Sequence, residues 1–146
     1  MLTRILELVV LLSAGTAAGV LFAVALSVVP AFIAMPPDRY VYTHRMLRNW
    51  DPTMPAIVLS GAVVNVLLAA LGKGTLFGAA AALMVGVSAV SHLCNVPINR
   101  DVRMTDPGSL PADWRDPRPS WRRWHLLRTI LAFAALVADG LAIVHL

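Results

Sequence analysis

The chain has 146 residues, of which 58% are hydrophobic and 14% charged, and its mean hydropathy is +0.73. Soluble globular domains are about half apolar with about a quarter of their residues charged, so this composition excludes an ordinary soluble domain and indicates a membrane protein. The net charge of +4 favours lipid headgroups over a nucleic-acid partner, because of where the cations lie. Cys94 is the only cysteine, which excludes an intramolecular disulfide.

Four apolar blocks are long enough to cross a bilayer, which takes roughly 20 residues for each helix. We expect helices at about residues 5–34, 55–72, 75–96 and 121–145, with loops at 36–54 and 97–120. The apolar part of the first block exceeds the roughly 7–15 residues of a signal-peptide core, so we expect it to remain as a helix. The prediction is one all-α domain over residues 1–146, an integral membrane bundle of four transmembrane helices.

In the first helix, Gly15 and Gly19 are four residues apart and each follows an alanine. Small residues at this spacing allow two helix backbones to approach closely in a membrane; alternatively, they only fill an apolar helix. Pro30 is expected to kink or end the helix, and Pro36 and Pro37 to end it.

The next segment, residues 38–50, is charged and aromatic. Four of its side chains share one side of a helix: Tyr40, Val41, Leu47 and Trp50. We expect a short interfacial helix, capped by Asp38, with its Tyr and Trp at headgroup depth. Gly72–Lys73–Gly74 then predicts a tight turn, so that the second and third membrane helices form an antiparallel hairpin.

The positive charges are unevenly divided between the two ends of this topology. Of the 12 Lys and Arg residues, Arg4 and Lys73 lie on one side. The others lie on the opposite side: Arg39, Arg45, Arg48, Arg100, Arg103, Arg115, Arg118, Arg122, Arg123 and Arg128. The positive-inside rule therefore predicts a multi-pass protein of the cell membrane with its first and third loops cytoplasmic and both termini outside.

One face of the fourth helix is polar within the membrane. At 100° per residue, six residues fall within about 40° of one line: Trp121, His125, Arg128, Ala132, Ala135 and Asp139. Ionisable groups at this depth cost roughly 2.5–3.5 kcal/mol each, so we expect this face to point into the bundle. Alternatively, Arg128 snorkels to cytoplasmic phosphates and Asp139 is a neutral packing device.

The third helix offers matching groups near its end. Ser88, His92 and Asn95 share a face, and Pro97 is expected to open the last turn because it lacks a backbone donor. Asn95 and Asn99 bracket this break, and Arg128 has up to five donors for the freed groups. A plainer reading of His92 is a hydrogen-bonded core histidine.

A copper or iron site is a weaker alternative. Its ligands would be His92, Cys94 and His125, with His44 reaching in from the surface helix. The chain lacks the paired spacings typical of metal-binding helices. We therefore expect no metal. The chain also has no serine-nucleophile elbow, which argues against Ser-His-Asp catalysis, and no glycine-rich phosphate loop.

Two cytoplasmic segments resemble a known family. Residues 95–100 read Asn-Val-Pro-Ile-Asn-Arg and resemble the signature Asn-x-Pro-[Leu/Ile]-Asn, and residues 121–129 read Trp-Arg-Arg-Trp-His-Leu-Leu-Arg-Thr and resemble Trp-x-x-Trp-[Asn/His]-x-x-Arg-Thr. The chain thereby resembles the anthrone oxygenase-like family of small four-helix membrane proteins, over nearly its whole length.

This resemblance implies a four-helix bundle and the oxidation of an anthrone-type, polyketide-like aromatic substrate by O₂, without an evident metal or flavin. The residues that it implicates are Asn95, Asn99, Trp121, Trp124, His125 and Arg128. We expect His125 to be the base, with Arg128 and Asn95 stabilising the enolate. Substrate-binding residues would be Trp121, Trp124, Asn99 and His92. Many members have Asn where this chain has His125, which argues against a general metal-ligand role there.

Two other functions remain open from the sequence. The chain could be a non-catalytic membrane subunit whose polar stripe binds a partner helix or a lipid headgroup. A small-molecule permease is disfavoured, because four short helices would form a path only as a homo-oligomer, and the oligomeric state is left open. The sequence therefore leans toward an enzyme with a small planar hydrophobic substrate.

Overall fold

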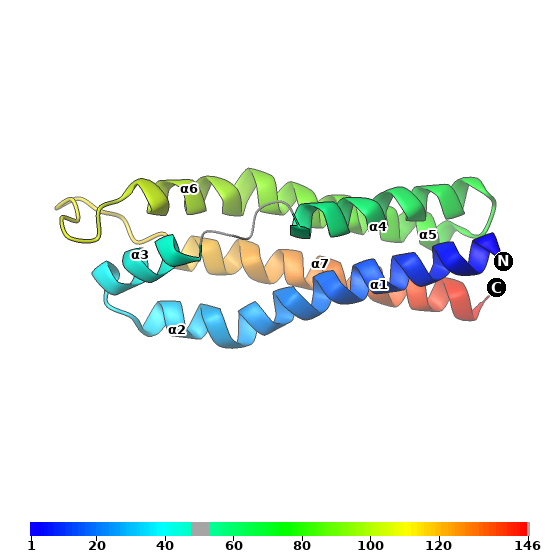
Figure 1. The fold of residues 1–146 in the computed structure, drawn as a ribbon, viewed down its shortest axis with the longest axis horizontal. Coiled ribbons are helices and arrows are strands. Elements are labelled where there is room, and N and C mark those ends of the chain that lie inside the picture. Colours follow the sequence, from blue (N-terminus) through cyan, green and yellow to red (C-terminus); the bar gives the residue numbers. More distant parts are fainter. Residues whose placement is uncertain (48–52, 146) are drawn as a thin grey trace.

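The computed structural model describes residues 1–47 and 53–145, and the regular structure in those ranges is all helical (Figure 1). The elements are α1 (Leu2–Ala23), η1 (Val24–Val28), α2 (Val29–Ala34), α3 (Pro37–Met46), α4 (Thr53–Ala70), α5 (Thr75–Val90), η2 (Ser91–Asn95), α6 (Val96–Met104) and α7 (Arg118–Val144). The two η elements are π-helical turns inside otherwise continuous helices.

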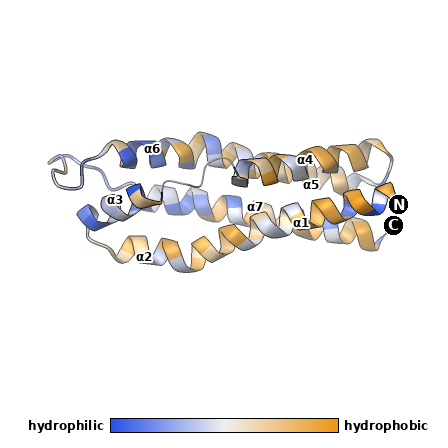
Figure 2. Cartoon of the chain, viewed as in Figure 1, coloured by the Kyte–Doolittle hydropathy of each residue, from blue (hydrophilic) through white to orange (hydrophobic). Residues whose placement is uncertain are grey.

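Four rods run along the length of the molecule, namely α1–η1–α2, α4, α5–η2–α6 and α7. All four are long and apolar enough to cross a membrane, and hydrophobic residues cover most of their length (Figure 2). α1 and α5 each pack against both α4 and α7, and the two termini lie at the same end (Figure 1). The expected all-α bundle of four membrane helices with one additional short helix is therefore confirmed.

Two prolines that were expected to break helices are accommodated inside them. Pro30 follows η1 directly and Pro97 follows η2. A proline removes one backbone donor and clashes with the carbonyl four residues earlier, and a widened π turn relieves that clash while the helix goes on. Consequently the third rod does not end near residue 96 but continues to Met104, and α7 begins at Arg118. The loop expected at 97–120 is shortened from both ends.

The short helix α3 lies across the end of the bundle opposite the termini and contacts α6 (Figure 1). Tyr40 and Val41 are completely buried against other parts of the protein, and the headgroup depth expected for Tyr40 stays a prediction. They pack in an end cluster with Phe32, Val102 and Trp121. The inward face of α3 therefore contacts protein.

Two expectations about α3 need correction. Its N-cap is Pro36 and makes no side-chain hydrogen bond, so Asp38 lies in the first turn and is not the cap. Leu47 lies just after the helix and is exposed, although Tyr40 and Val41 on the same predicted side are buried. Trp50, the last residue of that predicted side, lies outside the described residues.

Small residues do bring the helices together, but they are not the expected glycines. On α1 the buried small residues are Ala14, Ala17 and Ala18, whereas Gly19 is exposed with nothing within 4 Å of a Cβ built there. The close approach occurs at Gly61 of α4. A Cβ at this position would lie 2.9 Å from both Ser13 Cβ and Met84 Cε. Hydrogen at this position therefore lets α4 approach α1 and α5.

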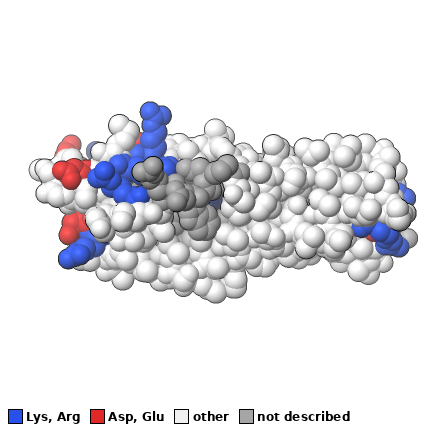
Figure 3. Space-filling view, in the orientation of Figure 1, with Lys and Arg blue, Asp and Glu red and all other residues white. Residues whose placement is uncertain are grey.

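On the face shown in Figure 3, the charged side chains of the described residues gather toward the two ends of the rods. Most of the blue atoms there lie at the end formed by α3 and α6, and fewer lie near the termini. The distribution along the bundle thus follows the asymmetry expected from the sequence.

We predict that Gly61→Val destabilises the bundle by about 1–3 kcal/mol, because an added side chain must displace Ser13 or Met84. The measurement is unfolding in detergent by heat or denaturant. Gly19→Val is the matched control and should change stability by less than about 0.5 kcal/mol. Equal stability of the two variants would contradict the packing described for α4.

Candidate functional site

The two π turns face the same segment of α7. On one side, His125 Nε2 lies 2.9 Å from the carbonyl oxygen of Leu21, three residues before the start of η1. On the other side, Arg128 Nη1 donates to Ser91 Oγ, the first side chain of η2, at 3.2 Å. π turns alter the local hydrogen-bond register of a helix and are frequent at functional sites. The polar segment of α7 is therefore held between two irregular turns.

The hydrogen bonds of His125 determine its tautomer. A carbonyl oxygen only accepts hydrogen bonds, so Nε2 carries the proton and donates it to Leu21. Nδ1 is then the ring's acceptor, and it receives donors from Arg128 Nε at 3.3 Å and Arg128 Nη2 at 2.9 Å. His125 is completely buried, and both of its nitrogens are engaged.

Arg128 is the cation at the centre of this arrangement. Its guanidinium is part-buried and donates to two neutral acceptors, His125 Nδ1 and Ser91 Oγ. Ser91 Oγ in turn donates to the carbonyl of Val87 at 2.7 Å. In the described part of the chain, no carboxylate forms an ion pair with Arg128. In this conformation the Arg128 guanidinium therefore points to His125 and Ser91 within the bundle, and does not snorkel away from it.

Trp121 connects His125 to the third rod. Its ring stacks on His125 with centroids 5.2 Å apart and planes 14° apart. Its Nε1 donates to Asn99 Oδ1 at 2.8 Å, and its carbonyl accepts from Asn95 Nδ2 at 3.2 Å. Asn99 Oδ1 also accepts from His44 Nε2 of α3 at 3.2 Å. A continuous polar network thus runs from α3 through α6 to α7.

Several buried polar atoms around this network have no hydrogen-bond partner within the described ranges. They include Asn95 Oδ1, His44 Nδ1 and the hydroxyl of Tyr40. A buried acceptor without a partner costs about 1–3 kcal/mol, and such costs are typical of sites that receive a ligand or an ordered water. The network therefore carries spare hydrogen-bonding capacity beside the Arg128 cation.

The structure brings together five of the seven predicted site residues: Asn95, Asn99, Trp121, His125 and Arg128. The other two lie apart from this group. Trp124 is 38% exposed. His92 is exposed, and its Nδ1 contacts Ser88 within its own helix.

Two contributors were not assigned from the sequence. Ser91 takes the place expected for Ser88, because it is the serine that contacts Arg128. His44 was considered only as a metal ligand, yet it contacts Asn99. At 100° per residue, Ser91 lies about 40° from Asn95, a sign that Ser91 shares this face. No comparable signal marks His44, because its position depends on how α3 folds back.

The residues proposed for the copper or iron alternative do not converge. Across residues 1–47 and 53–145, no three His, Cys, Asp or Glu side chains lie close enough to hold one metal ion. His92 points outward while His125 is buried in the bundle. The acceptors near His125, such as Ser91 Oγ, Asn99 Oδ1 and the Leu21 carbonyl, make hydrogen bonds to nitrogen donors.

Asp139 belongs to a separate polar site nearer the termini. Its carboxyl is completely buried and faces the equally buried Asn65 of α4. The apolar cluster that contains Ala132 and Ala135 lies between this pair and Arg128 along α7. Asp139 is therefore not the counter-ion of Arg128.

His44 lies outside the membrane-spanning helices, and its pKa is lowered from the ordinary 6.5. The main cause is burial; the hydrogen bond to Asn99 opposes the shift, and the charge of Arg103 adds to it. His44 is therefore neutral at pH 7, with Nε2 as the donor.

We predict that His125→Phe destabilises the protein by about 1–3 kcal/mol, because the Leu21 carbonyl then loses its side-chain donor and Arg128 loses an acceptor. Unfolding in detergent measures the change. His92→Phe is the matched control, since His92 is exposed, and should stay within about 0.5 kcal/mol. Equal effects at both positions would show that the His125 bonds do not stabilise the fold.

We also predict a pH effect through His44. Its folded-state pKa lies below that of the unfolded chain, so the unfolded state binds the proton first as the pH falls. The stability present above about pH 6.5 is then lost as the pH falls through the folded pKa. His44→Gln should reduce the change of the unfolding midpoint with pH between about pH 7 and pH 5. Tyr42→Gln, which alters an exposed neighbouring residue, should leave that pH dependence unchanged. An unchanged slope in His44→Gln would refute this assignment.

Comparison with known proteins places this network in a family. A family model described as anthrone oxygenase matches residues 44–138. The matched region extends from His44 through Asn95 and Asn99 to Trp121, His125 and Arg128, so it includes every member of the network that lies on α3, α6 and α7. Searches of the curated proteins and of the solved structures give no match to this chain. The chain belongs to the anthrone oxygenase family.

Proposed function

We propose that this protein is a membrane-embedded oxygenase that oxidises a planar, hydrophobic, anthrone-type substrate of polyketide character with O₂. In this proposal His125, Arg128 and Asn95 carry the chemistry, and Trp121 and Asn99 position the substrate. His92 and Trp124 are left out, because their side chains lie apart from the network. Family membership supports the reaction class.

The observation that carries the proposal is that no described carboxylate forms an ion pair with the Arg128 guanidinium. A guanidinium removed from water is costly unless an anion or several acceptors compensate it. Arg128 has only the neutral acceptors His125 and Ser91 among the described residues. Such a guanidinium can stabilise a negative charge that forms on a ligand only during the reaction, as the donors of an oxyanion hole do.

The proposed reaction converts the CH₂ group of the central ring, which lies across that ring from the ketone and is conjugated with it through the aromatic rings, into a second carbonyl. Removal of one CH proton gives an enolate, whose carbon bonds to O₂ and, with a proton, forms a hydroperoxide. Removal of the second proton from that carbon breaks the O–O bond and leaves C=O and water. One O₂ is consumed, one oxygen atom enters the product and the other leaves as water. The enolate is the electron donor, so we propose no metal and no flavin.

The geometry suggests how one pair of side chains serves both the proton and the charge. In the structure, Arg128 donors occupy the lone pair of His125 Nδ1, the only ring nitrogen that can act as a base. A substrate oxygen that draws those donors onto itself frees Nδ1 to take the CH proton. The Leu21 carbonyl, which accepts from Nε2, then stabilises the imidazolium that forms.

The remaining groups fit substrate binding. Asn95 Oδ1 is buried without a hydrogen-bond partner in the described structure and can accept from a substrate hydroxyl. Trp121 already stacks on the His125 ring, and its indole offers a flat surface for a planar ring system. Under the positive-inside rule, we propose that this end of the bundle faces the cytoplasm. The substrate then reaches the site from the inner leaflet.

One observation favours a second function, that of a non-catalytic membrane subunit. His125 and Asn95 are completely buried, and the bonds among His125, Arg128 and Ser91 close on themselves. A network of this kind can also brace four helices without reacting. An assay of the purified protein distinguishes the two functions.

We predict that purified protein in detergent accelerates the conversion of anthrone to anthraquinone under air, with one O₂ consumed for each quinone formed. Arg128→Gln should lower kcat by about 10²–10³-fold, as for loss of an oxyanion donor, and His125→Gln by about 10²–10⁴-fold, as for loss of a base. Absorbance of the quinone and an oxygen electrode follow the reaction against protein-free detergent.

Arg100→Gln and His92→Gln are the matched controls, because both side chains are exposed and lie outside the network; both variants should keep full activity. Absence of acceleration with anthrone and with hydroxylated anthrones would favour the subunit. Stoichiometric copper or iron in the active sample would overturn the cofactor-free reaction.

A further inference from the structure

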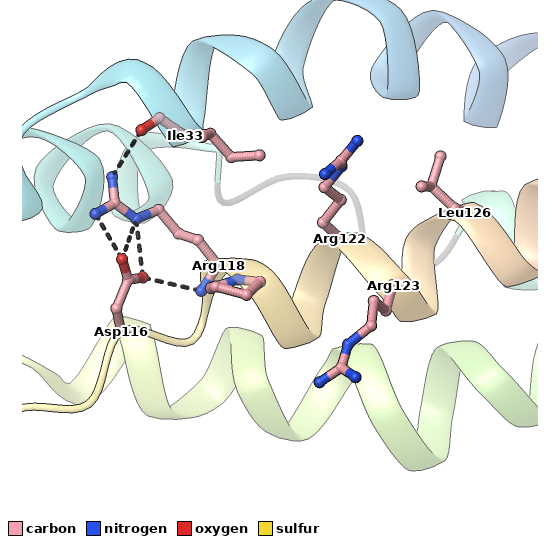
Figure 4. Close-up of a pocket in the computed structure, with 7 residues that line it drawn as sticks. Ile33, Asp116, Arg118, Arg122, Arg123 and Leu126 are labelled. Carbon is pink, nitrogen blue, oxygen red and sulfur yellow. Dashed lines mark hydrogen bonds and ion pairs between the residues drawn. The ribbon is translucent and has the colours of Figure 1, made fainter.

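Two adjoining recesses lie on the outer side of α7, away from the polar network. The basic recess, of about 510 Å³, is lined by Arg118, Arg122 and Arg123 together with Asp116, Ile33 and Leu126 (Figure 4). The apolar groove, of about 720 Å³, is lined mainly by side chains of α7, among them Leu126, Ile130, Phe133 and Val137, with others from α1, η1 and α5. Leu126 belongs to both, so the basic recess continues into the apolar groove.

The cations of the basic recess are only partly compensated. Arg118 is bound to Asp116 through contacts of 2.7–2.9 Å, and this guanidinium lowers the pKa of the Asp116 carboxyl. Arg118 also donates to the carbonyl of Met35 at 2.6 Å. Arg122 and Arg123 form no ion pair with any described residue, and Figure 4 draws no interaction to either. Two of the three arginines therefore remain available to an anion.

The recess and the groove follow one line along the helix. At 100° per residue, Arg122, Leu126, Ile130, Phe133 and Val137 fall within about 40° of a common direction. Arg122 lies at the start of this stripe, near the boundary of the membrane-spanning helix. At about 1.5 Å per residue, the stripe from Leu126 to Val137 extends about 16 Å, roughly half of the 30 Å hydrocarbon thickness.

This stripe is separate from the candidate active site. His125 and Arg128 point about 130° away from it around α7, and they contact Leu21 and Ser91 inside the bundle. Ile130 is 65% exposed and Val137 57% exposed, so the groove opens outward. A ligand in the groove would face the hydrocarbon of the bilayer.

We propose that the basic recess and the apolar groove form a binding site for a phospholipid with a net negative headgroup. Arg122 contacts the phosphate, Arg123 adds to the positive potential from about 100° further around the helix, and one acyl chain lies along the groove. A zwitterionic headgroup is electrically neutral and leaves both free cations uncompensated. An acidic headgroup supplies the missing charge while the bilayer supplies the chain, because groove and recess meet at the membrane boundary.

The experiment uses delipidated full-length protein in a mild non-ionic detergent. Phosphatidylglycerol and phosphatidylcholine with identical acyl chains are titrated separately, and bound lipid is counted by native mass spectrometry. Glycerol 3-phosphate, which carries the anion without the chains, is the third probe. We expect saturable binding of phosphatidylglycerol, weaker binding of phosphatidylcholine and no retention of glycerol 3-phosphate.

Variants test the assigned residues. Arg122→Gln should weaken phosphatidylglycerol binding by roughly fivefold, and Arg123→Gln should weaken it less, because Arg123 lies off the line of the groove. Arg115→Gln is the matched control, since it removes one exposed charge from the preceding loop, and should leave the affinity unchanged. Folding of each variant is checked by its unfolding midpoint in the same detergent.

Each other outcome contradicts the proposal. Equal affinity for the two lipids would remove the role of the headgroup charge. An unchanged phosphatidylglycerol affinity in the Arg122→Gln variant would remove the assigned site. Glycerol 3-phosphate that binds as tightly as the lipid would identify the site as one for a soluble anion. Since the readout is bound lipid, these results do not depend on whether the protein oxidises anthrone.

Discussion

The bond between His125 and the backbone carbonyl of Leu21 is the interaction on which the rest of the site depends. It joins α7 to the first rod just before η1 and assigns the ring proton to Nε2. Only because Nε2 carries the proton can Nδ1 accept from Arg128, and Arg128 then contacts Ser91 at the second π turn. One histidine thus sets the geometry of a guanidinium between two rods that are far apart in sequence.

The fold was predictable because it depends on long-range hydrophobic patterning, which prolines interrupt only locally. The polar stripe of α7 was predictable for the same reason: α7 is regular from Arg118 to Val144, so 100° per residue holds along it. The third rod is different, because η2 puts additional residues into one turn. Residues beside a π turn rotate relative to a straight helix, and His92, which was expected on the same face as Asn95, faces outward.

Other parts of the site could not be read from periodicity. α3 has a polar surface composition, yet Tyr40 and Val41 are buried because the chain folds back onto α6 and the end of the first rod. His44 reaches Asn99 only through that tertiary contact. The assignment of Trp124 came from a resemblance between motifs, not from its position on the helix, and its side chain is partly exposed.

The first turns of α7 serve two environments from opposite sides. Arg128 faces inward, where few acceptors and no described carboxylate compensate it, while Arg122 faces the boundary with lipid and water. Charges more than about 8–10 Å apart are screened where water and salt reach them, but those inside the bundle are not. The proposed anion at Arg122 would therefore compensate charge at the surface of the protein without neutralising Arg128 inside the bundle. Under the two proposals, Arg128 would thus remain available to a negative charge generated on a substrate within the protein, while Arg122 would bind the lipid headgroup.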